Sequence, residues 1–299
     1  MTTHAIEIRG LIKKHPNFQL GPLSLTVPCG AIYGLIGPNG AGKTTTIDLL
    51  FGLGRNEAGQ IQVLGCDHRA DAVRVKQLAA YVSPELDFQV WGKVGKAIRF
   101  VRGFYPGWDD AYCAALMKMF HLDARDRIAT LSFGAKTKLS LLLALARRPE
   151  VLILDEPLTG LDALSKQQLF RELLQVVEEG RRTVLISSHS LGDIERFADH
   201  VGLLKDGRMV LEGRMDEVVD RYRLVEFFTR EGSGIGDTLP EGLTMLRWKG
   251  NRGHALLDQR SGAREWLQGQ GAQDLSLTPV TLEDLCVALS KEEEALCGD

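Results

Sequence analysis

Apolar and polar residues alternate near the start of the chain, in a pattern typical of half-buried β-strands. The alternating apolar positions are Ile6, Ile8, Leu23, Leu25 and Val27. An apolar run over residues 31–36 then leads directly into a glycine-rich segment. Beyond that segment, apolar residues recur at helical spacing from Ile47 to Phe51, until Gly52 breaks the pattern. We therefore predict strands, a glycine-rich turn and a helix, in that order.

Residues 85–135 carry a different pattern, with apolar side chains at helical spacing on either side of a turn. The apolar positions are Ile98, Val101, Phe104, Leu116, Met119 and Phe120, and the turn is Tyr105-Pro106-Gly107. We predict a helical insert over this range. A further helix begins at Ala135 and has to end before Pro149, because proline cannot continue a helix.

Two apolar strands separated by an amphipathic helix follow the insert. The first strand, Val151–Leu154, is apolar at every position, which is typical of a strand buried on both faces. The helix ends at Gly180, and the second strand is Val184–Ile186. This alternation predicts an α/β fold with a mainly parallel sheet and helices on its faces. We expect the strands at the N-terminus to be antiparallel.

The sequence changes character after the first two thirds of the chain. We predict one domain over residues 1–220 and a small accessory α+β region over 221–299. Gly232–Gly236 is typical of a loop and does not fit the dinucleotide-binding fingerprint. Thr281–Asp284 has the composition of a helix cap and predicts a last helix. Short apolar segments predict strands at Val225–Phe228, Met245–Trp248 and Ala255–Leu257.

Composition narrows the classes of protein to consider. Hydrophobic residues make up 44% and charged residues 25% of the 299 residues, an ordinary balance for a soluble globular protein. The net charge of −3 supplies no basic field, so no nucleic-acid partner is expected. The N-terminus does not resemble a signal peptide, and the apolar stretch Leu139–Ala146 is too short to span a bilayer. The five cysteines include no CxxC pair, which favours a reducing, cytoplasmic compartment.

The glycine-rich segment has the spacing GxxxxGK[ST] of a phosphate-binding loop, or P-loop. Its sequence is Gly37, Pro38, Asn39, Gly40, Ala41, Gly42, Lys43 and Thr44. In this motif backbone N–H groups and a helix N-terminus surround the β-phosphate of a nucleotide. Lys43 would contact the β- and γ-phosphates, and the Thr44 hydroxyl would bind Mg²⁺. A chance glycine-rich turn is the alternative, but the strand before the segment and the helix after it are the context that the motif requires.

Two carboxylates and a histidine follow the predicted strands at 151–154 and 184–186. Ligands of a parallel sheet bind beyond the carboxyl ends of its strands, which brings Asp155, Glu156 and His189 to the P-loop. Asp155 would hold Mg²⁺ through water, Glu156 would orient water for in-line attack, and His189 would contact the γ-phosphate. The alternative for the acids is that they cap the next turn.

These motifs and their order resemble the nucleotide-binding subunit of an ATP-binding cassette (ABC) transporter over residues 4–215. Leu131–Ala135 takes the place of the family signature LSGGQ and opens a helix. Thr159–Asp162 resembles the D-loop of the family, and Thr45 extends the P-loop. The resemblance implies a P-loop NTPase core of the RecA-like kind that binds ATP and Mg²⁺.

The resemblance also implies a mechanism in which two such subunits enclose two ATP molecules head to tail. Lys43, Glu156 and His189 would be the catalytic residues. Ser132, Gly134 and the first amides of their helix would face the γ-phosphate bound to the P-loop of the other subunit. ATP binding would join the subunits and hydrolysis would loosen them. A homodimer and a heterodimer with a related cassette both satisfy this arrangement.

The chain departs from the family pattern at several positions. Phe133 replaces the first glycine of the signature. In the Q-loop, Pro84 stands where the glutamine belongs, so Glu85 is the candidate for metal or water contact. The tyrosine that commonly stacks on adenine is replaced by His15, and Phe18 is the competing candidate.

Phe104–Asp109 and Val280–Leu285 are similar to bacterial exporters of the multidrug, bacteriocin and antibiotic-resistance type. This likeness implies a separate transmembrane permease subunit and a location on the inner face of the cell membrane. The surface near Phe88 and Trp91 would then receive a coupling helix of the permease. The transported substrate and the role of residues 221–299 stay open.

Two other functions are compatible with a P-loop. A cassette ATPase acting on ribosomes or DNA usually carries two cassettes, a coiled-coil insertion or zinc cysteines, and this sequence has none of them. A nucleotide kinase or GTPase would leave Ser132, Gly134 and His189 without a role. Export powered by ATP is therefore the predicted function.

Overall fold

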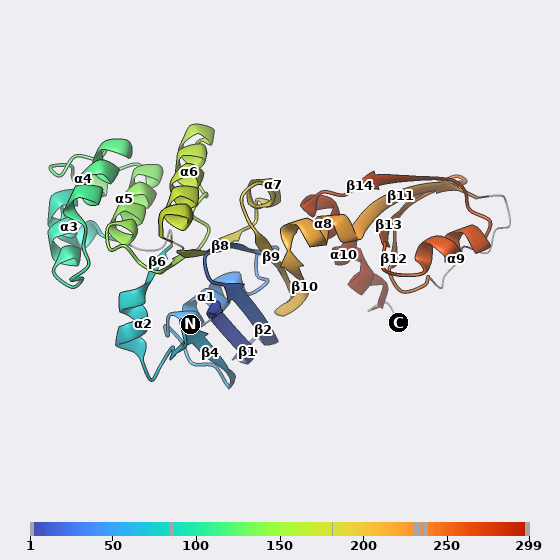
Figure 1. Ribbon diagram of the computed structural model, residues 1–299, viewed down its shortest axis with the longest axis horizontal. Coiled ribbons are helices and arrows are strands. Elements are labelled where there is room, and N and C mark those ends of the chain that lie inside the picture. Colours follow the sequence, from blue (N-terminus) through green and yellow to red (C-terminus); the bar gives the residue numbers. More distant parts are fainter. Residues whose placement is uncertain (1–2, 84–86, 181, 230–234, 236–238, 297–299) are drawn as a thin grey trace. The chain divides into compact units, whose positions relative to one another are not determined.

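The computed structural model describes residues 3–83, 87–180, 182–229, 235 and 239–296. The chain forms two compact units, one of residues 1–189 and 197–209 and the other of residues 190–196 and 210–299. Figure 1 shows the elements of both. Among the described residues, we find no helix with the length and apolarity needed to cross a membrane. The predicted division after residue 220 stays a prediction.

The central sheet has six strands in the order β10-β9-β3-β8-β7-β6, and the first unit holds β9, β3, β8, β7 and β6. The register is parallel from β9 through β3, β8 and β7 to β6, which confirms the predicted mainly parallel sheet. Every residue of β3 and β7 is buried, as expected for strands covered on both faces. The strands are β3 (Ile32–Ile36), β6 (Ala79–Val82), β7 (Val151–Leu154), β8 (Thr183–Ser188), β9 (His200–Lys205) and β10 (Arg208–Arg214).

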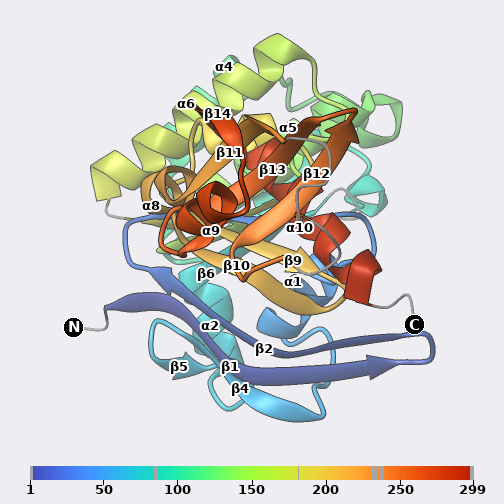
Figure 2. The ribbon, with the colours of Figure 1, turned by 90° about the vertical axis from the view of Figure 1, so that its right-hand side faces the viewer.

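The N-terminal strands form a separate antiparallel sheet, β2-β1-β4-β5, as predicted for the start of the chain. Figure 2 shows its two longest strands side by side. The apolar side chains of this sheet share one core with Ile47 and Leu50 of α1 (Lys43–Leu50), so the helix that follows the glycine-rich segment is anchored by both sheets. The strands are β1 (His4–His15), β2 (Phe18–Pro28), β4 (Ala58–Val63) and β5 (Cys66–Asp67).

The predicted helical insert is present and packs on the helix that begins at the signature segment (Figure 1). Arg147, near the end of that helix, donates to the carbonyl oxygens of Lys76 and Ala79 at 2.5 and 3.0 Å. Its guanidinium carbon lies 3.5 Å from the ring centroid of Tyr105 in the insert. The helices of this unit are α2 (Ala72–Leu78), α3 (Val94–Arg102), α4 (Asp110–Met119), α5 (Phe133–Leu145) and α6 (Ala163–Gly180), with 3₁₀ turns η1 (Gln89–Trp91) and η2 (Ile128–Thr130).

The second unit contains an antiparallel sheet with the order β12-β13-β11-β14. The predicted strands of this unit are confirmed. The capped last helix is also confirmed, because Thr281 and Asp284 each accept from the main-chain N–H of the other. An ion pair between Arg221 and the buried Asp258 joins α8 to β13. Gly232–Gly236 lies outside the described residues except for Ile235. The elements are α7 (Leu191–Glu195), α8 (Met215–Arg221), β11 (Tyr222–Phe228), β12 (Leu243–Lys249), β13 (Arg252–Asp258), α9 (Ala263–Gly269), β14 (Gln273–Pro279) and α10 (Leu282–Leu296).

Candidate functional site

The glycine-rich segment connects β3 to α1 in a turn that requires glycine at two positions, Gly37 and Gly42. Gly37 has φ +152°, and a Cβ there would overlap the carbonyl group of Leu204 on β9. Gly42 has φ +105° and caps α1, with the Phe18 ring 3.0 Å from the place of a Cβ. The segment is therefore held close to the sheet, and α1 begins at Lys43 immediately after it.

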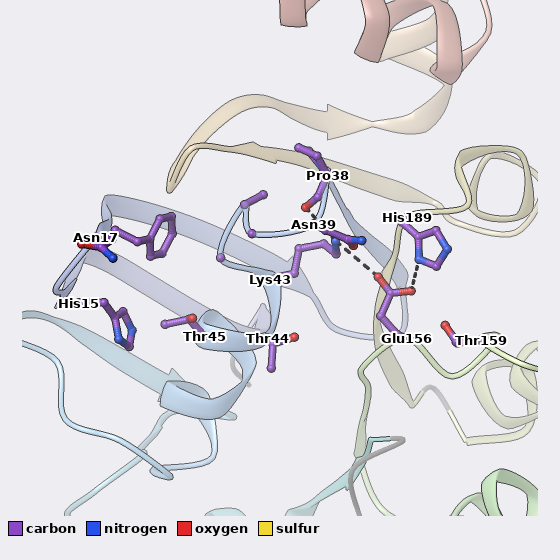
Figure 3. A pocket seen from close by; sticks show the side chains of 14 residues that line it. His15, Asn17, Pro38, Asn39, Lys43, Thr44, Thr45, Glu156, Thr159 and His189 are labelled. Atoms are coloured by element: carbon purple, nitrogen blue, oxygen red, sulfur yellow. Dashed lines mark hydrogen bonds and ion pairs between the residues drawn. The ribbon is translucent and has the colours of Figure 1, made fainter. Parts of the chain in front are cut away.

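A cavity of about 780 Å³ lies beside this segment, within the size range of small-molecule ligand sites. Figure 3 shows it, with His15 and Asn17 at one end and Glu156, Thr159 and His189 at the other. The structure thus brings together residues that are far apart in the sequence. The cavity is lined by His15, Asn17, Phe18, Pro38, Asn39, Gly40, Ala41, Gly42, Lys43, Thr44, Thr45, Glu156, Thr159 and His189.

The Lys43 side chain is almost fully buried, with 6% of its surface exposed. Its Nζ donates to the carbonyl oxygens of Gly37 and Pro38 at 2.7 and 3.2 Å, and lies 3.4 Å from Oε1 of Glu156 (Figure 3). The ammonium group is thus fixed at the floor of the cavity by acceptors on three residues. It is positioned to attract a phosphate bound there.

Glu156 stands between Lys43 and His189. Its Oε2 lies 2.7 Å from Nδ1 of His189, while its Oε1 faces Lys43 (Figure 3). The backbone of Glu156 has φ 47°, a left-handed conformation that non-glycine residues rarely adopt and that costs about 1–2 kcal/mol. Strain of this kind concentrates at functional sites, where the surroundings hold a side chain in a required place.

Ser187 organises the acidic pair, a role that the sequence analysis did not assign. Its hydroxyl donates to Oδ1 of Asp155 at 2.5 Å and accepts from the main-chain N–H of Glu156 at 2.9 Å. Both Ser187 and Asp155 are buried, so these bonds are shielded from water. The signal in the sequence was two serines at the end of an apolar strand, immediately before His189.

The signature residues lie outside this cavity. Ser132 caps α5, with its Oγ accepting from the N–H of Ala135 at 3.2 Å, and it is exposed. Gly134 faces the turn at Gly160 and Leu161, at ordinary packing distance. A contact between Ser132 or Gly134 and a nucleotide therefore requires a cavity other than the one lined by the P-loop of the same chain.

Both candidates for stacking on a nucleotide base line the cavity. The ring centroids of His15 and Phe18 are 6.2 Å apart and the rings are inclined at 32°. His15 is exposed, whereas Phe18 is half-buried and packs on the core between the two sheets. The Q-loop candidates Pro84 and Glu85 lie outside the described residues, so the metal contact of Glu85 stays a prediction.

Comparison with known proteins shows the family to which the chain belongs. Residues 20–159 match the family model described as ABC transporter. The chain is 33% identical over 218 residues to the ABC transporter ATP-binding protein YtrB of Bacillus subtilis, across 73% of this chain and 74% of that protein. The chain belongs to the ABC transporter family. It is also 30% identical to the Nod factor export ATP-binding protein I of Burkholderia lata, over 98% of this chain and 99% of that protein.

Solved structures agree with the assignment to the ABC family. An ATP-binding subunit of an ABC transporter matches with a TM-score of 0.64 and 27% identity, over 72% of this chain and 92% of the other. The chain is thus an ATP-binding P-loop ATPase subunit of the ABC family, as predicted. Subunits of this family generally dimerise and pair with a transmembrane permease.

Proposed function

We propose that this chain hydrolyses ATP with Mg²⁺ and powers export through a separate permease. The observation that carries the proposal is the meeting of Lys43, Glu156 and His189 at one cavity. In the proposed reaction Lys43 holds the β- and γ-phosphates, and Glu156 orients the attacking water. His189, bonded to Glu156, contacts the γ-phosphate. Thr45 and the main-chain N–H groups of residues 37 and 39–44 surround the remaining phosphate oxygens.

The proposed Mg²⁺ ligands are Thr44 and Asp155, directly and through water respectively. An exposed hydroxyl at the start of α1 and a carboxylate at the end of β7 are hard oxygen donors, the kind that Mg²⁺ takes together with substrate phosphates. Ser187 holds one oxygen of Asp155 in place and leaves the other for the metal site. The ion would neutralise charge on the phosphates when bound.

We propose further that two subunits pair head to tail. The support is the exposure of Ser132 and its position outside the cavity of its own chain. Placed against the P-loop of a partner, the capped N-terminus of α5 would present hydroxyl and amide donors to the γ-phosphate. Because Glu156, His189 and Ser132 are all present, a homodimer could complete two sites.

Export is favoured by the similarity to the Nod factor export ATP-binding protein I, which aligns with nearly all of this chain. A permease would dock on the apolar surface formed by Val90, Trp91, Phe100 and Phe104. The Trp91 and Phe100 rings stack with centroids 3.7 Å apart, and the Phe104 ring meets Phe100 edge-on. Val90 is 82% exposed and Phe104 is 64% exposed, which leaves an apolar surface for a protein partner. Docking there would hold the subunit on the cytoplasmic face of the membrane.

The test is purification of the tagged, full-length chain from detergent-solubilised membranes of its own cells. We expect a multispanning membrane protein to co-purify and to raise ATP hydrolysis. The double variant Phe100→Ser/Phe104→Ser should recover much less of it, whereas Leu53→Ser, an exposed apolar residue elsewhere, should recover as much as wild type. Recovery of ribosomes or DNA in place of a membrane protein would favour the alternative function.

A further inference from the structure

The ring of Phe133 lies directly against the backbone of Gly160. Phe133 is the first residue of α5, and Gly160 belongs to the turn that follows Glu156. A Cβ at Gly160 would fall 2.7 Å from Cε1 of Phe133 and closer still to Cδ1. Gly160 also has φ +73°, a conformation that favours glycine. No side chain could occupy this position without displacing the ring.

The contact joins two segments that are each internally fixed. The turn is closed by the N–H of Thr159 donating to the carbonyl of Glu156 at 3.2 Å, and by Leu161 donating to Leu158 at 3.2 Å. The signature segment is closed by the Ser132 cap. Because closely packed groups transmit strain, a displacement of the signature segment would also displace the turn at Gly160.

The two segments serve different ATP molecules if the proposed head-to-tail dimer is correct. Thr159 and Glu156 line the cavity of their own chain. Ser132, next to Phe133, would face the nucleotide bound by the partner. We propose that Phe133 is a positioning residue that couples the two ATP sites, because its ring carries a shift of the signature segment to the turn that holds Glu156. This inference rests on the proposed function. A glycine, which the family pattern places at this position, would have no side chain to make the contact.

The coupling is measured as the dependence of ATP hydrolysis on ATP concentration, using the full-length chain. We expect a Hill coefficient above 1 for wild type, falling to about 1 in Phe133→Ala, with ATP binding to Lys43 and its loop unchanged. Phe133→Leu keeps an apolar side chain over Gly160 and should keep most of the cooperativity. Val73→Ala, which removes another exposed apolar side chain, should match wild type. A purely structural role would lower the melting temperature without changing the Hill coefficient.

A double-mutant cycle tests whether the effect passes through the contact itself. Gly160→Ala forces a Cβ into the Phe133 ring, so it should slow hydrolysis more in the wild-type background than in Phe133→Ala, by roughly threefold or more. The backbone strain at Gly160 is the same in both backgrounds and cancels in the cycle. An unchanged Hill coefficient in Phe133→Ala, or additive effects in the cycle, would overturn the inference alone. Absence of hydrolysis in wild type would overturn the proposed function, and this inference with it.

Discussion

Nδ1 of His189 lies 2.7 Å from Oε2 of Glu156, and this bond joins the ends of two neighbouring strands. The other oxygen of Glu156 is 3.4 Å from Nζ of Lys43. One carboxylate is thus held at both of its oxygens, on a backbone in a left-handed conformation. The orientation of the Glu156 side chain is therefore set by His189 and Lys43.

Replacing Glu156 with glutamine keeps the shape of the side chain and removes its negative charge. We expect Glu156→Gln to bind ATP and to lose about 100-fold or more of its hydrolysis rate, because the amide is a poor base. ATP-bound dimers should accumulate and be visible by size-exclusion chromatography. Lys43→Ala is the contrasting variant and should lose nucleotide binding. Near-normal turnover in Glu156→Gln would show that another group activates the water.

Ser187→Ala removes the hydroxyl that bonds both Asp155 and the N–H of Glu156. The buried Asp155 carboxylate and the part-buried N–H of Glu156 each lose a partner, so the free energy of unfolding should fall by about 1–3 kcal/mol. The rate of hydrolysis should also fall, and the Mg²⁺ concentration for half-maximal rate should rise. Ser187→Thr keeps a hydroxyl and should recover part of both losses. A stability loss without any change in Mg²⁺ dependence would limit Ser187 to a structural role.

His15 and Phe18 can be separated by comparing ATP with tripolyphosphate as ligands. Stacking on a base is worth about 1–3 kcal/mol, so His15→Ala should weaken ATP binding by roughly 5- to 100-fold. Binding of tripolyphosphate, which has no base, should be unchanged. His15→Tyr should restore ATP binding. Phe18→Ala should chiefly lower stability, because Phe18 packs on the core. The reverse outcome would make Phe18 the stacking residue.

The Arg221–Asp258 pair makes the stability of the second unit depend on pH. Burial raises the pKa of Asp258, but the bonds from Arg221 and from the main-chain N–H of Arg260 outweigh it, so the pKa lies below its usual value. Because the pKa of Asp258 is lower in the folded than in the unfolded protein, its carboxylate stabilises the fold fully at pH values above the unfolded pKa, near 3.9. This stabilisation is lost as the pH falls through the folded pKa. Asp258→Asn should therefore lose about 1–3 kcal/mol at pH 7.

The deficit of Asp258→Asn should shrink as the pH falls below about 4, because the wild-type carboxyl becomes protonated there as well. Urea unfolding at a series of pH values measures it. Lys249→Gln, a charge change at the exposed end of β12, provides the control. A deficit that does not change with pH would mean that packing, rather than charge, is lost in the variant.

Much of the fold could be predicted because its signals are local. The apolar run at 151–154 and the spacing of the P-loop each determine their structure within a few residues. The strands β4 and β14 were not predicted, because short mixed sequences such as these are stabilised by their neighbours in the sheet. Local pattern carries little information about such pairing.

The candidate site could likewise be predicted only in part. Lys43, Glu156 and His189 were predicted because each follows a recognisable strand or loop. The hydrogen bonds of Ser187 and the packing of Phe133 on Gly160 depend on segments far apart in the sequence, so no local pattern indicates them. Asn17 and Thr159 line the cavity for the same reason, through the meeting of distant turns.

The contacts of the Arg147 guanidinium restrict which residues can be replaced during evolution without detaching the insert. Two of its partners are main-chain carbonyls, at residues 76 and 79, and these are present whatever side chains occur there. Drift at these two positions leaves the attachment of the insert intact. Arg147 itself has no such freedom, since a lysine has neither the planar fork nor the flat face that lies over Tyr105. The attachment therefore constrains the side chains of Arg147 and Tyr105, but not those of residues 76 and 79.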